Sequence, residues 1–385
     1  MKIGILTFHH VINDGSVLQA YCLQRLIESM LPEAKVELID YRSWNWEKRE
    51  LRKTIRRKFP FVRVDNWNRR KHLLNFLHRE CRLSHGSCTT DNLHRGEKFI
   101  EKQGYDVIVV GSDTVWQVPN LAIKQGIPHV FYLPHINDVK KVAFAASADI
   151  LDVSILDQDN NREKLRACVA DFNYISYRDD SARTLLSELH IPMADCHFIA
   201  DPTVLWDFSS LARPEGIDLE DKQPLAGISV AQDDVKAEAT KWFRARGYQV
   251  VNFLGNVIEG QIPVPDSFYK SIAQRLYFFQ HLDVLVTDRF HSSIFAMKLA
   301  DAPVIFIEPS KKYQHSFSKG RDLFRRLGME EMVWPYSPES GAKIPIDKYL
   351  QKWNGLQIHP KEAIGSLREL CKDALEHLRS EMMKV

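Results

Sequence analysis

The chain has 385 residues, of which 44% are hydrophobic and 26% are charged, with a formal net charge of +2. This length exceeds the size at which one hydrophobic core keeps growing, so we expect two lobes of ordinary domain size. The balanced composition excludes a disordered chain and a dedicated nucleic-acid-binding protein. No apolar stretch is long enough to span a bilayer, and the run at residues 1–8 is too short for a signal peptide, so we expect a cytoplasmic protein.

The first half of the chain alternates short apolar runs with amphipathic stretches, a pattern typical of parallel sheets flanked by helices. Residues 3–8 are predicted to form a strand, residues 17–30 a helix and residues 36–41 the next strand, which together make one βαβ unit. Further buried strands are predicted at 106–110, 142–146 and 172–177. Polar residues follow each of them, and open α/β sheets bind ligands at such strand ends.

The second half repeats this pattern after a linker at 206–224, which contains Pro214, Gly216 and clustered charges. Strands are predicted at 225–230, 249–254, 283–287 and 303–307, and helices at 234–246, 268–281, 292–299 and about 360–382. The pattern therefore predicts an N-terminal lobe at 1–207, a C-terminal lobe at 222–358 and a C-terminal helix at 359–385.

A basic, tryptophan-rich insertion at about 44–100 interrupts the alternation of the first lobe. Between Lys48 and Lys71 the chain holds eleven Lys or Arg and two acids, with aromatic residues interleaved. One interpretation is a solvated helical insertion, because charge runs usually form solvated faces. The other is a peripheral contact of residues 44–71 with the inner face of a membrane, because basic and aromatic residues together favour an anionic interface. No nucleic-acid recognition motif accompanies the run, so we expect no nucleic-acid partner.

The cysteine and histidine patterns do not predict a metal site. The six cysteines are scattered without a CxxC pair, which fits neither a disulfide framework nor a zinc site. His9 and His10 are adjacent, point in different directions and make a poor metal pair. Their loop, residues 8–16, lacks the GxGxxG pattern of dinucleotide-binding proteins. This loop is expected either to line an acceptor site or to be an ordinary surface loop.

The most informative segment is Thr-Asp-Arg-Phe-His-Ser-Ser at 287–293, where a predicted strand ends and a helix begins. A helix N-terminus offers unpaired N–H groups and a partial positive charge, which attract phosphate or carboxylate. Arg289 and His291 at this turn suit an anionic substrate that also needs a proton. The structural alternative is that Asp288 caps the helix and Arg289 only pairs with it.

Two further strand ends carry polar residues. Arg178 follows the strand at 172–177 and is placed for a bidentate contact with an anion, or alternatively for a salt bridge to Asp179 or Asp180. Gly111 allows the backbone to approach a ligand closely, and Asp113 is placed to accept a hydrogen bond from a sugar hydroxyl. A turn with a capping aspartate explains the second pattern equally well.

Taken in order, these segments resemble the polysaccharide pyruvyl transferase family over most of the chain. The segments that carry the resemblance are 2–8 with 15–21, 110–113 with Trp116, 175–179, 201–203 and 287–292. The sequence departs from the family's pattern at Ser16, where many relatives have a smaller residue, and at Ser292–Ser293, which lacks the glycine that often follows the histidine. These departures concern the identity of the acceptor more than the use of the donor.

The resemblance implies an α/β fold like that of the GT-B glycosyltransferases, with two Rossmann-like lobes facing a cleft. It implies a transferase that moves a pyruvyl group from phosphoenolpyruvate to two hydroxyls of one sugar, giving a cyclic ketal, in the biosynthesis of a cell-surface polysaccharide or glycan. Its partners are phosphoenolpyruvate and a sugar acceptor, which we expect to be lipid-linked. The scheme requires no metal and no cofactor, since phosphoenolpyruvate is the donor substrate.

The resemblance also assigns roles to residues. Arg178, Arg289 and His291 are the expected catalytic residues, because two guanidinium groups can clamp the carboxylate and phosphate of the donor while a histidine protonates its methylene carbon. The expected donor site comprises Arg178, Arg289, Phe290, His291 and Ser292, and the expected acceptor site comprises His9, His10, Gly15 and Asp113. The alternatives are a GT-B-like glycosyltransferase with a nucleotide-sugar donor and a non-catalytic binding protein with the same fold.

Overall fold

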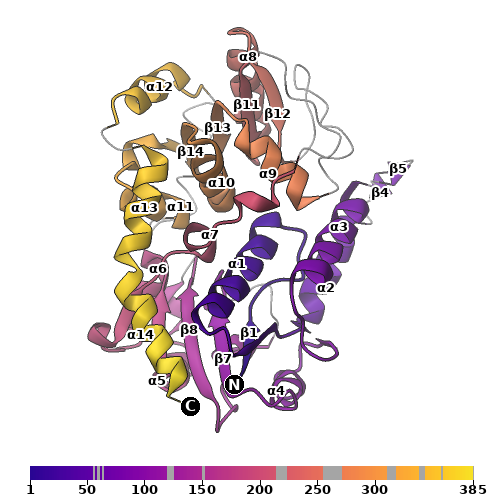
Figure 1. Ribbon diagram of the computed structural model, residues 1–385, viewed down its shortest axis with the longest axis vertical. Coiled ribbons are helices and arrows are strands. Elements are labelled where there is room, and N and C mark those ends of the chain that lie inside the picture. The colour runs from indigo at the N-terminus through magenta and orange to yellow at the C-terminus, as the bar shows by residue number, and fades with distance from the viewer. Residues whose placement is uncertain are drawn as a thin grey trace. The chain divides into compact units, whose positions relative to one another are not determined.

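A computed structural model describes residues 1–54, 57–58, 61–62, 65–118, 125–149, 152–213, 223–254, 271–309, 318–337, 343–356 and 359–384. Within these ranges, side chains are not described at 53, 57–58, 61–62, 65–66 and 309. The chain forms two compact units, shown in Figure 1. Unit 1 comprises Met1–Trp206 and Leu370–Val385, and unit 2 comprises Asp207–Glu369. The expected cleft between two lobes stays a prediction.

Unit 1 is built on a six-stranded parallel sheet with the order β10-β9-β8-β7-β1-β2. Its strands are β1 (Lys2–Leu6), β2 (Lys35–Leu38), β7 (Val107–Gly111), β8 (Lys140–Ala146), β9 (Tyr174–Tyr177) and β10 (Cys196–Phe198). The sequence VIVVG of β7 is buried throughout, as expected of a strand covered on both faces. Because β2 lies on one side of β1 and β7 on the other, the strand order reverses next to β1. The three-residue edge strand β10 is too short to give a sequence signal and was not predicted.

Several helices of unit 1 begin at side-chain caps. The Asn13 side chain accepts a hydrogen bond from Gly15 at the start of α1, Asp179 caps α6 and Asp201 caps α7. The helices outside the insertion are α1 (Asp14–Met30), α4 (Leu93–Glu101), α5 (Asn161–Ala170), α6 (Asp180–Glu188), α7 (Pro202–Leu205) and α14 (Lys372–Met383), with short 3-10 turns at Val130–Tyr132, Val153–Ile155 and Met193–Asp195. Trp116 stacks on Tyr132 in the core beneath them, with 6.0 Å between the ring centroids.

The predicted insertion is a helical hairpin. Figure 1 shows α2 (Trp44–Thr54) and α3 (Asp65–Glu80) side by side, with the antiparallel pair β4 (Arg57–Lys58) and β5 (Phe61–Val62) beyond their ends. A second small pair, β3 (Tyr41–Arg42) and β6 (Cys88–Thr89), flanks the hairpin in the chain. Trp44 is 47% exposed and Trp67 is 54% exposed. Two basic residues of α3 are paired, Arg69 with Asp14 and Arg70 with Glu47.

Unit 2 contains a five-stranded parallel sheet with the order β12-β11-β13-β14-β15. The strands are β11 (Leu225–Ser229), β12 (Gln249–Asn252), β13 (Val284–Thr287), β14 (Val304–Pro309) and β15 (Val333–Tyr336). Here β11 lies between β12 and β13, so the order reverses at the same place as in unit 1. Sequence analysis missed β15, an edge strand whose apolar run is interrupted by Pro335.

The described helices of unit 2 are α8 (Asp233–Arg244), α9 (Ile272–Gln280), α10 (Phe290–Ala300), α11 (Lys319–Arg326), α12 (Ile346–Asn354) and α13 (Pro360–Leu370), with 3-10 turns at Ser209–Leu211 and Glu330–Met332. The helices α9 and α10 pack together through Phe279 and Phe295, whose ring centroids are 5.5 Å apart. Across the described part of the chain, no helix is both long and apolar enough to cross a membrane.

The C-terminal segment differs from the single helix expected at about 360–382. It forms α13, which ends at Leu370, and α14, which belongs to unit 1. Cys371 is buried between the two helices, and its sulfur lies 3.3 Å from the backbone nitrogen of Ala200. The Tyr174 hydroxyl donates to the carbonyl of Ala374 at 2.6 Å. Leu370, the last residue of α13, is 67% exposed.

Candidate active site

Most of the candidate residues lie where the strand order of a parallel sheet reverses. In unit 1, His9, His10, Gly15 and Asp113 follow the C-terminal ends of β1 and β7, which are neighbours in the sheet, whereas Arg178 follows β9. In unit 2 they follow the end of β13, whose neighbour in the sheet is β11. Adjacent loops run to opposite faces of the sheet at such a position, and ligands of open α/β sheets bind there.

In unit 2 the turn from β13 into α10 is fixed by hydrogen bonds. The Thr287 hydroxyl donates to the carbonyl of Ser229 at 3.0 Å and accepts from the backbone N–H of Arg289 at 2.9 Å. The Asp288 carboxylate accepts from the backbone N–H of Ala231 at 3.1 Å. These bonds tie the ends of β11 and β13 together and set where α10 begins. Arg289 is the N-cap residue, so the helix starts two residues earlier than predicted.

Arg289 holds an exposed positive charge at this helix N-terminus. Its side chain is 48% exposed, and its Nε lies 2.8 Å from Asp288 Oδ1. The ion pair agrees with the structural alternative considered for Arg289, but Asp288 does not cap the helix. Exposed ion pairs of this kind contribute little to stability, and a guanidinium has five donors. The geometry is therefore compatible with contact between Arg289 and an anionic ligand.

His291 lies in the first turn of α10 and is partly buried. Its ring meets Phe290 edge-on, with centroids 5.1 Å apart, and lies 6.3 Å from the ring of Phe295. Phe290 and Ser292 are buried, and Ser292 Oγ lies 3.4 Å from Ser229 Oγ. The expected donor contacts of Phe290 and Ser292 stay predictions, and the backbone N–H groups of this first helical turn are the atoms that suit an anion.

In unit 1 the guanidinium of Arg178 is surrounded by carboxylates. Its side chain is 1% exposed and bonds to Asp201, and it lies 3.6 Å from both Asp113 and Asp179. Burial acts to lower the pKa of Arg178, but the three carboxylates outweigh burial and raise it. The salt bridge anticipated with Asp179 is therefore present as part of a larger cluster, in which Asp201 is the nearest partner. Whether Arg178 also contacts the donor, and whether it converges with Arg289, stay predictions.

The residues around Gly111 and Asp113 support this cluster. Gly111 has φ +128, and a Cβ atom there would lie 2.0 Å from the carbonyl oxygen of Phe144 on β8. The neighbouring strand therefore leaves no room for a side chain at Gly111, while the close approach of a ligand to its backbone stays a prediction. Asp113 accepts from the Ser16 hydroxyl at 2.8 Å and from the backbone N–H of Thr114 at 2.9 Å. Its expected contact with a sugar hydroxyl stays a prediction, as does that of Gly15, whose N–H is bound by the cap of α1.

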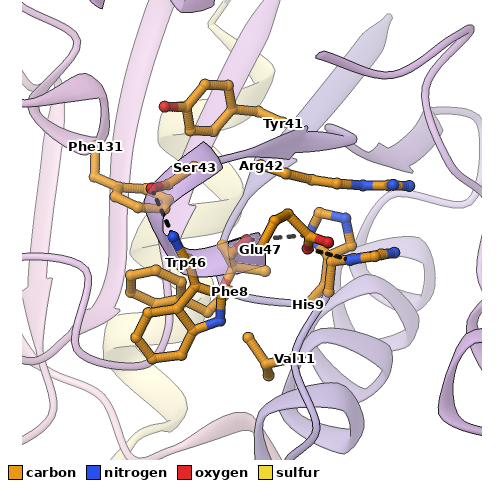
Figure 2. A pocket seen from close by; sticks show the side chains of 11 residues that line it. Phe8, His9, Val11, Tyr41, Arg42, Ser43, Trp46, Glu47 and Phe131 are labelled. Carbon is orange, nitrogen blue, oxygen red and sulfur yellow. Dashed lines mark hydrogen bonds and ion pairs between the residues drawn. The ribbon is translucent and has the colours of Figure 1, made fainter. Parts of the chain in front are cut away.

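A pocket opens beside His9 and His10, after the end of β1 (Figure 2). It contains about 320 Å³ of space, its open mouth included. The lining residues come from the β1–α1 loop, β3, the start of α2 and the 3-10 turn at 130–132: Thr7, Phe8, His9, His10, Val11, Tyr41, Arg42, Ser43, Trp46, Glu47 and Phe131. Both histidines predicted to contact an acceptor therefore lie in one pocket.

Sequence reasoning missed several residues of these clusters. Asp201 belongs to a segment that resembles the family, but its pairing with Arg178 depends on the contact between β9 and β10. Trp46 and Glu47 were assigned to the basic insertion, whereas they line the pocket. No sequence signal links them to His10, because the chain separates them by more than thirty residues. Within the described ranges, no three His, Cys, Asp or Glu side chains are arranged to hold a metal ion.

Comparison with solved structures defines the class of fold. A glycosyltransferase of kitacinnamycin matches with a TM-score of 0.52 and 10% identity, over 99% of each chain. The UDP-GlcNAc 2-epimerase of Neisseria meningitidis matches with a TM-score of 0.51 and 10% identity, over 98% of this chain and 100% of its own. A spinosyn rhamnosyltransferase matches with a TM-score of 0.50 and 8% identity, over 99% of each chain. The protein therefore has the α/β fold of the GT-B class, with a parallel sheet in each unit.

A sequence profile narrows this class to a family. The profile of the polysaccharide pyruvyl transferase family matches residues 13–310, which include the candidate residues of unit 2 and most of those of unit 1. The chain belongs to the polysaccharide pyruvyl transferase family. It is thus a member of a family of transferases that modify polysaccharides. A search of curated protein sequences gives no significant match.

Proposed function

We propose that this protein transfers a pyruvyl group from phosphoenolpyruvate to two hydroxyls of a sugar, forming a cyclic ketal in the synthesis of a cell-surface polysaccharide or glycan. The observation that carries the proposal is the position of Arg289 and His291. They lie at the N-terminus of α10, at the strand-order reversal of unit 2, within the segment that matches the family. An exposed cation, the N-terminus of a helix and a titratable ring suit a donor that is anionic and must be protonated.

The proposed chemistry assigns one task to each residue. Arg289 and the first turn of α10 hold the carboxylate or phosphate of phosphoenolpyruvate, and Arg178 supplies the second guanidinium. His291 protonates the methylene carbon, which gives C2 oxocarbenium-like character. One sugar hydroxyl attacks C2, phosphate leaves, and the second hydroxyl closes the ring. Because Arg178 is already surrounded by carboxylates, a donor oxygen would reach it only by entering between the guanidinium and one of them.

The donor is tested by thermal stabilisation of the purified protein. A ligand that binds the folded state at 100 times its Kd stabilises it by about 2.7 kcal/mol, so phosphoenolpyruvate should raise the Tm by several degrees. Arg289→Ala should remove this rise, since it removes the exposed cation. Arg244→Ala, which removes another exposed arginine of unit 2, is the matched control and should keep it.

Uridine diphosphate serves as the competing ligand in the same experiment. The alternative function is a glycosyltransferase with a nucleotide-sugar donor, and the GT-B fold is shared with such enzymes. A Tm rise with uridine diphosphate and none with phosphoenolpyruvate would replace the proposed function by this alternative.

We also propose that the acceptor is lipid-linked and that residues 44–71 contact the inner face of a membrane. The support is the eleven basic residues between Lys48 and Lys71 and the exposure of Trp44 and Trp67 at the hairpin surface. A protein attached in this way would meet a lipid-linked sugar at the membrane surface. The side chains of residues 55–66, where several of the basic residues fall, lie outside the described part of the structure.

A further inference from the structure

The pocket after β1 combines an aromatic wall with a polar wall. Figure 2 shows the rings of Phe8, Trp46 and Phe131 gathered on one side, while Arg42 and His9 extend on the other. The Phe8 ring lies 5.6 Å from Trp46 and 4.8 Å from Phe131, measured between centroids. A pyranose has one face of C–H groups and a rim of hydroxyls, so its two kinds of surface match the two walls.

The two histidines at this pocket are bound differently. His9 is held at both ring nitrogens, because Nδ1 lies 3.1 Å from the carbonyl oxygen of Thr7 and Nε2 lies 3.2 Å from Asp40 Oδ1. His10 is bound through Nδ1, which lies 2.6 Å from Glu47 Oε1. Its Nε2 makes no hydrogen bond to the described residues. His9 is therefore fixed in the structure, whereas His10 keeps one ring nitrogen for a ligand.

The partner of His10 determines which nitrogen carries its proton. The hydrogen bond from His10 and the charge of Arg70 outweigh burial and lower the pKa of Glu47, so this carboxylate is ionised and accepts the proton of Nδ1. Nε2 of the neutral ring then presents a lone pair. Burial, Arg42 and His9 lower the pKa of His10 against the opposing effect of Glu47, which favours this neutral form near pH 7. A carboxylate that orients an imidazole as a base is a recurring arrangement.

We propose that this pocket binds the acceptor sugar with its C–H face against Phe8 and Trp46, and that Nε2 of His10 takes the proton of the hydroxyl that attacks the donor. The inference rests on the proposed function for the identity of the donor, while the binding of a sugar in the pocket stands apart from it. Here His10 is a catalytic residue and Glu47 is a positioning residue.

In the transfer, His10 accepts a proton twice, once from each sugar hydroxyl. As the first hydroxyl oxygen forms its bond to C2 of phosphoenolpyruvate, its proton moves to His10 Nε2, and the π pair of the donor takes up a proton from the general acid at C3. The C2–O bond to phosphate then breaks, and the leaving phosphate keeps the bonding pair and takes the proton from His10. The second hydroxyl attacks C2 and passes its proton to Nε2, from which it returns to the acid through solvent. Of the two hydroxyl protons, one balances the new methyl C–H and the other leaves with phosphate.

Sugar binding is tested without the donor. Saturation-transfer difference NMR detects weak ligands, and the probes are the methyl pyranosides of glucose, galactose, mannose and N-acetylmannosamine. We expect at least one probe to bind the wild type through its C–H protons, Trp46→Ala to lose that signal and Trp46→Phe to restore part of it. Trp44→Ala is the matched control, because Trp44 lies two residues away, is exposed and does not line the pocket. Equal signals in Trp46→Ala and wild type, or no signal with any probe, would overturn the pocket assignment.

The role of His10 is tested by the rate of phosphate release from phosphoenolpyruvate in the presence of the probe that binds. His10→Gln should lower kcat about 100-fold or more, the usual effect of losing a general base, while the Tm rise with phosphoenolpyruvate stays. The wild-type rate should fall with decreasing pH once His10 becomes protonated, at a lower pH than for a free histidine because burial lowers the pKa of His10. This acidic limb should be absent in His10→Gln. Glu47→Gln should lower kcat and shift the limb without changing KM.

These outcomes separate the inference from the proposed function. If phosphoenolpyruvate does not raise the Tm of the wild type, the proposed function is contradicted. The NMR experiment still decides whether the pocket binds a sugar. If phosphoenolpyruvate raises the Tm of the wild type, but His10→Gln keeps the wild-type rate and the acidic limb of its pH profile, only the role of His10 is contradicted.

Discussion

Arg178 and His129 are both buried ionisable side chains of unit 1. The surroundings of Arg178 stabilise its charged form, whereas those of His129 stabilise its neutral form. Three carboxylates face Arg178, so its guanidinium stays charged inside the protein. His129 packs against the rings of Tyr132 and Phe131 at 4.8 and 6.0 Å. Burial lowers the pKa of His129 to about 4, against a weaker contribution from the backbone of Gln117. This ring is therefore neutral in the folded protein at pH 7.

The pKa of His129 predicts a loss of stability in mild acid. The unfolded chain binds a proton at this residue below about pH 6.5, whereas the folded chain does so only below about 4, so stability falls as the pH drops between these values. The contribution approaches about 3 kcal/mol near pH 4. In urea unfolding across this range, His129→Gln should show a shallower pH dependence than the wild type. His85→Gln, at an exposed position, should follow the wild type, and a wild-type slope retained in His129→Gln would contradict the assignment.

At the scale of elements, the ends of parallel strands position the candidate residues. The loops after β1 and β7 bring Thr7 and Ser112 together, and the Thr7 hydroxyl donates to the carbonyl of Ser112 at 3.1 Å. Ser112 in turn donates to Asp201, at the start of α7, at 3.2 Å. Since these contacts link three strand ends, the geometry around Arg178 depends on how closely β7 and β8 approach each other at Gly111.

Gly111→Ala should disrupt this part of unit 1. The new Cβ would lie 2.0 Å from the carbonyl oxygen of Phe144, and φ +128 is strained for any residue with a side chain. We expect a loss of more than about 3 kcal/mol in urea unfolding, because backbone atoms cannot move aside cheaply. Gly104→Ala is the control, since Gly104 has φ +63 with no atom within 4 Å of the added carbon. It should cost about 1–2 kcal/mol, and a similar loss in both variants would contradict the steric explanation.

At the scale of the whole molecule, the chain leaves unit 1 after Trp206 and returns to it at Leu370. The helix α14 is hydrogen-bonded to two strands of unit 1, through Tyr174 of β9 and Lys140 of β8. The ammonium of Lys140 donates to the carbonyl of Glu381 at 2.6 Å. The α2–α3 hairpin is the other long excursion of unit 1, and it carries most of the basic charge that the proposed membrane contact requires.

Vesicle sedimentation tests the membrane contact of the whole protein. Wild type should sediment with vesicles that contain anionic phosphatidylglycerol and less so as salt increases, because basic residues near a surface contribute about 1 kcal/mol each. Neutralising Arg56, Arg57 and Lys58 together should release the protein. Neutralising Arg95, Lys98 and Lys102, three exposed basic residues at or just after α4, is the matched control. Unchanged sedimentation of the first variant would contradict a contact through residues 44–71.

The sequence by itself determined the α/β class, most of the strands and the turn that carries Arg289 and His291. These follow from local patterns, since a buried strand is a short apolar run and a helix N-terminus follows it within a few residues. The GT-B fold and the family expected from the motifs are confirmed by the solved structures and by the profile. The short strand β10 and the proline-containing strand β15 were not predicted, because these edge strands have little hydrophobic pattern in the sequence.

Only the tertiary structure decided which residues meet. The order of the strands, and with it the position where each order reverses, depends on pairing between segments that are distant in the chain. Pairing between distant segments also places the carboxylates around Arg178, leaves no space for a side chain at Gly111 and brings His10 to Glu47. Local periodicity reports the burial of a segment but not its neighbours, because neighbours are chosen by packing across the sheet. That is why both histidines of the first loop looked alike in sequence, whereas in the fold one is held at both nitrogens and the other is not.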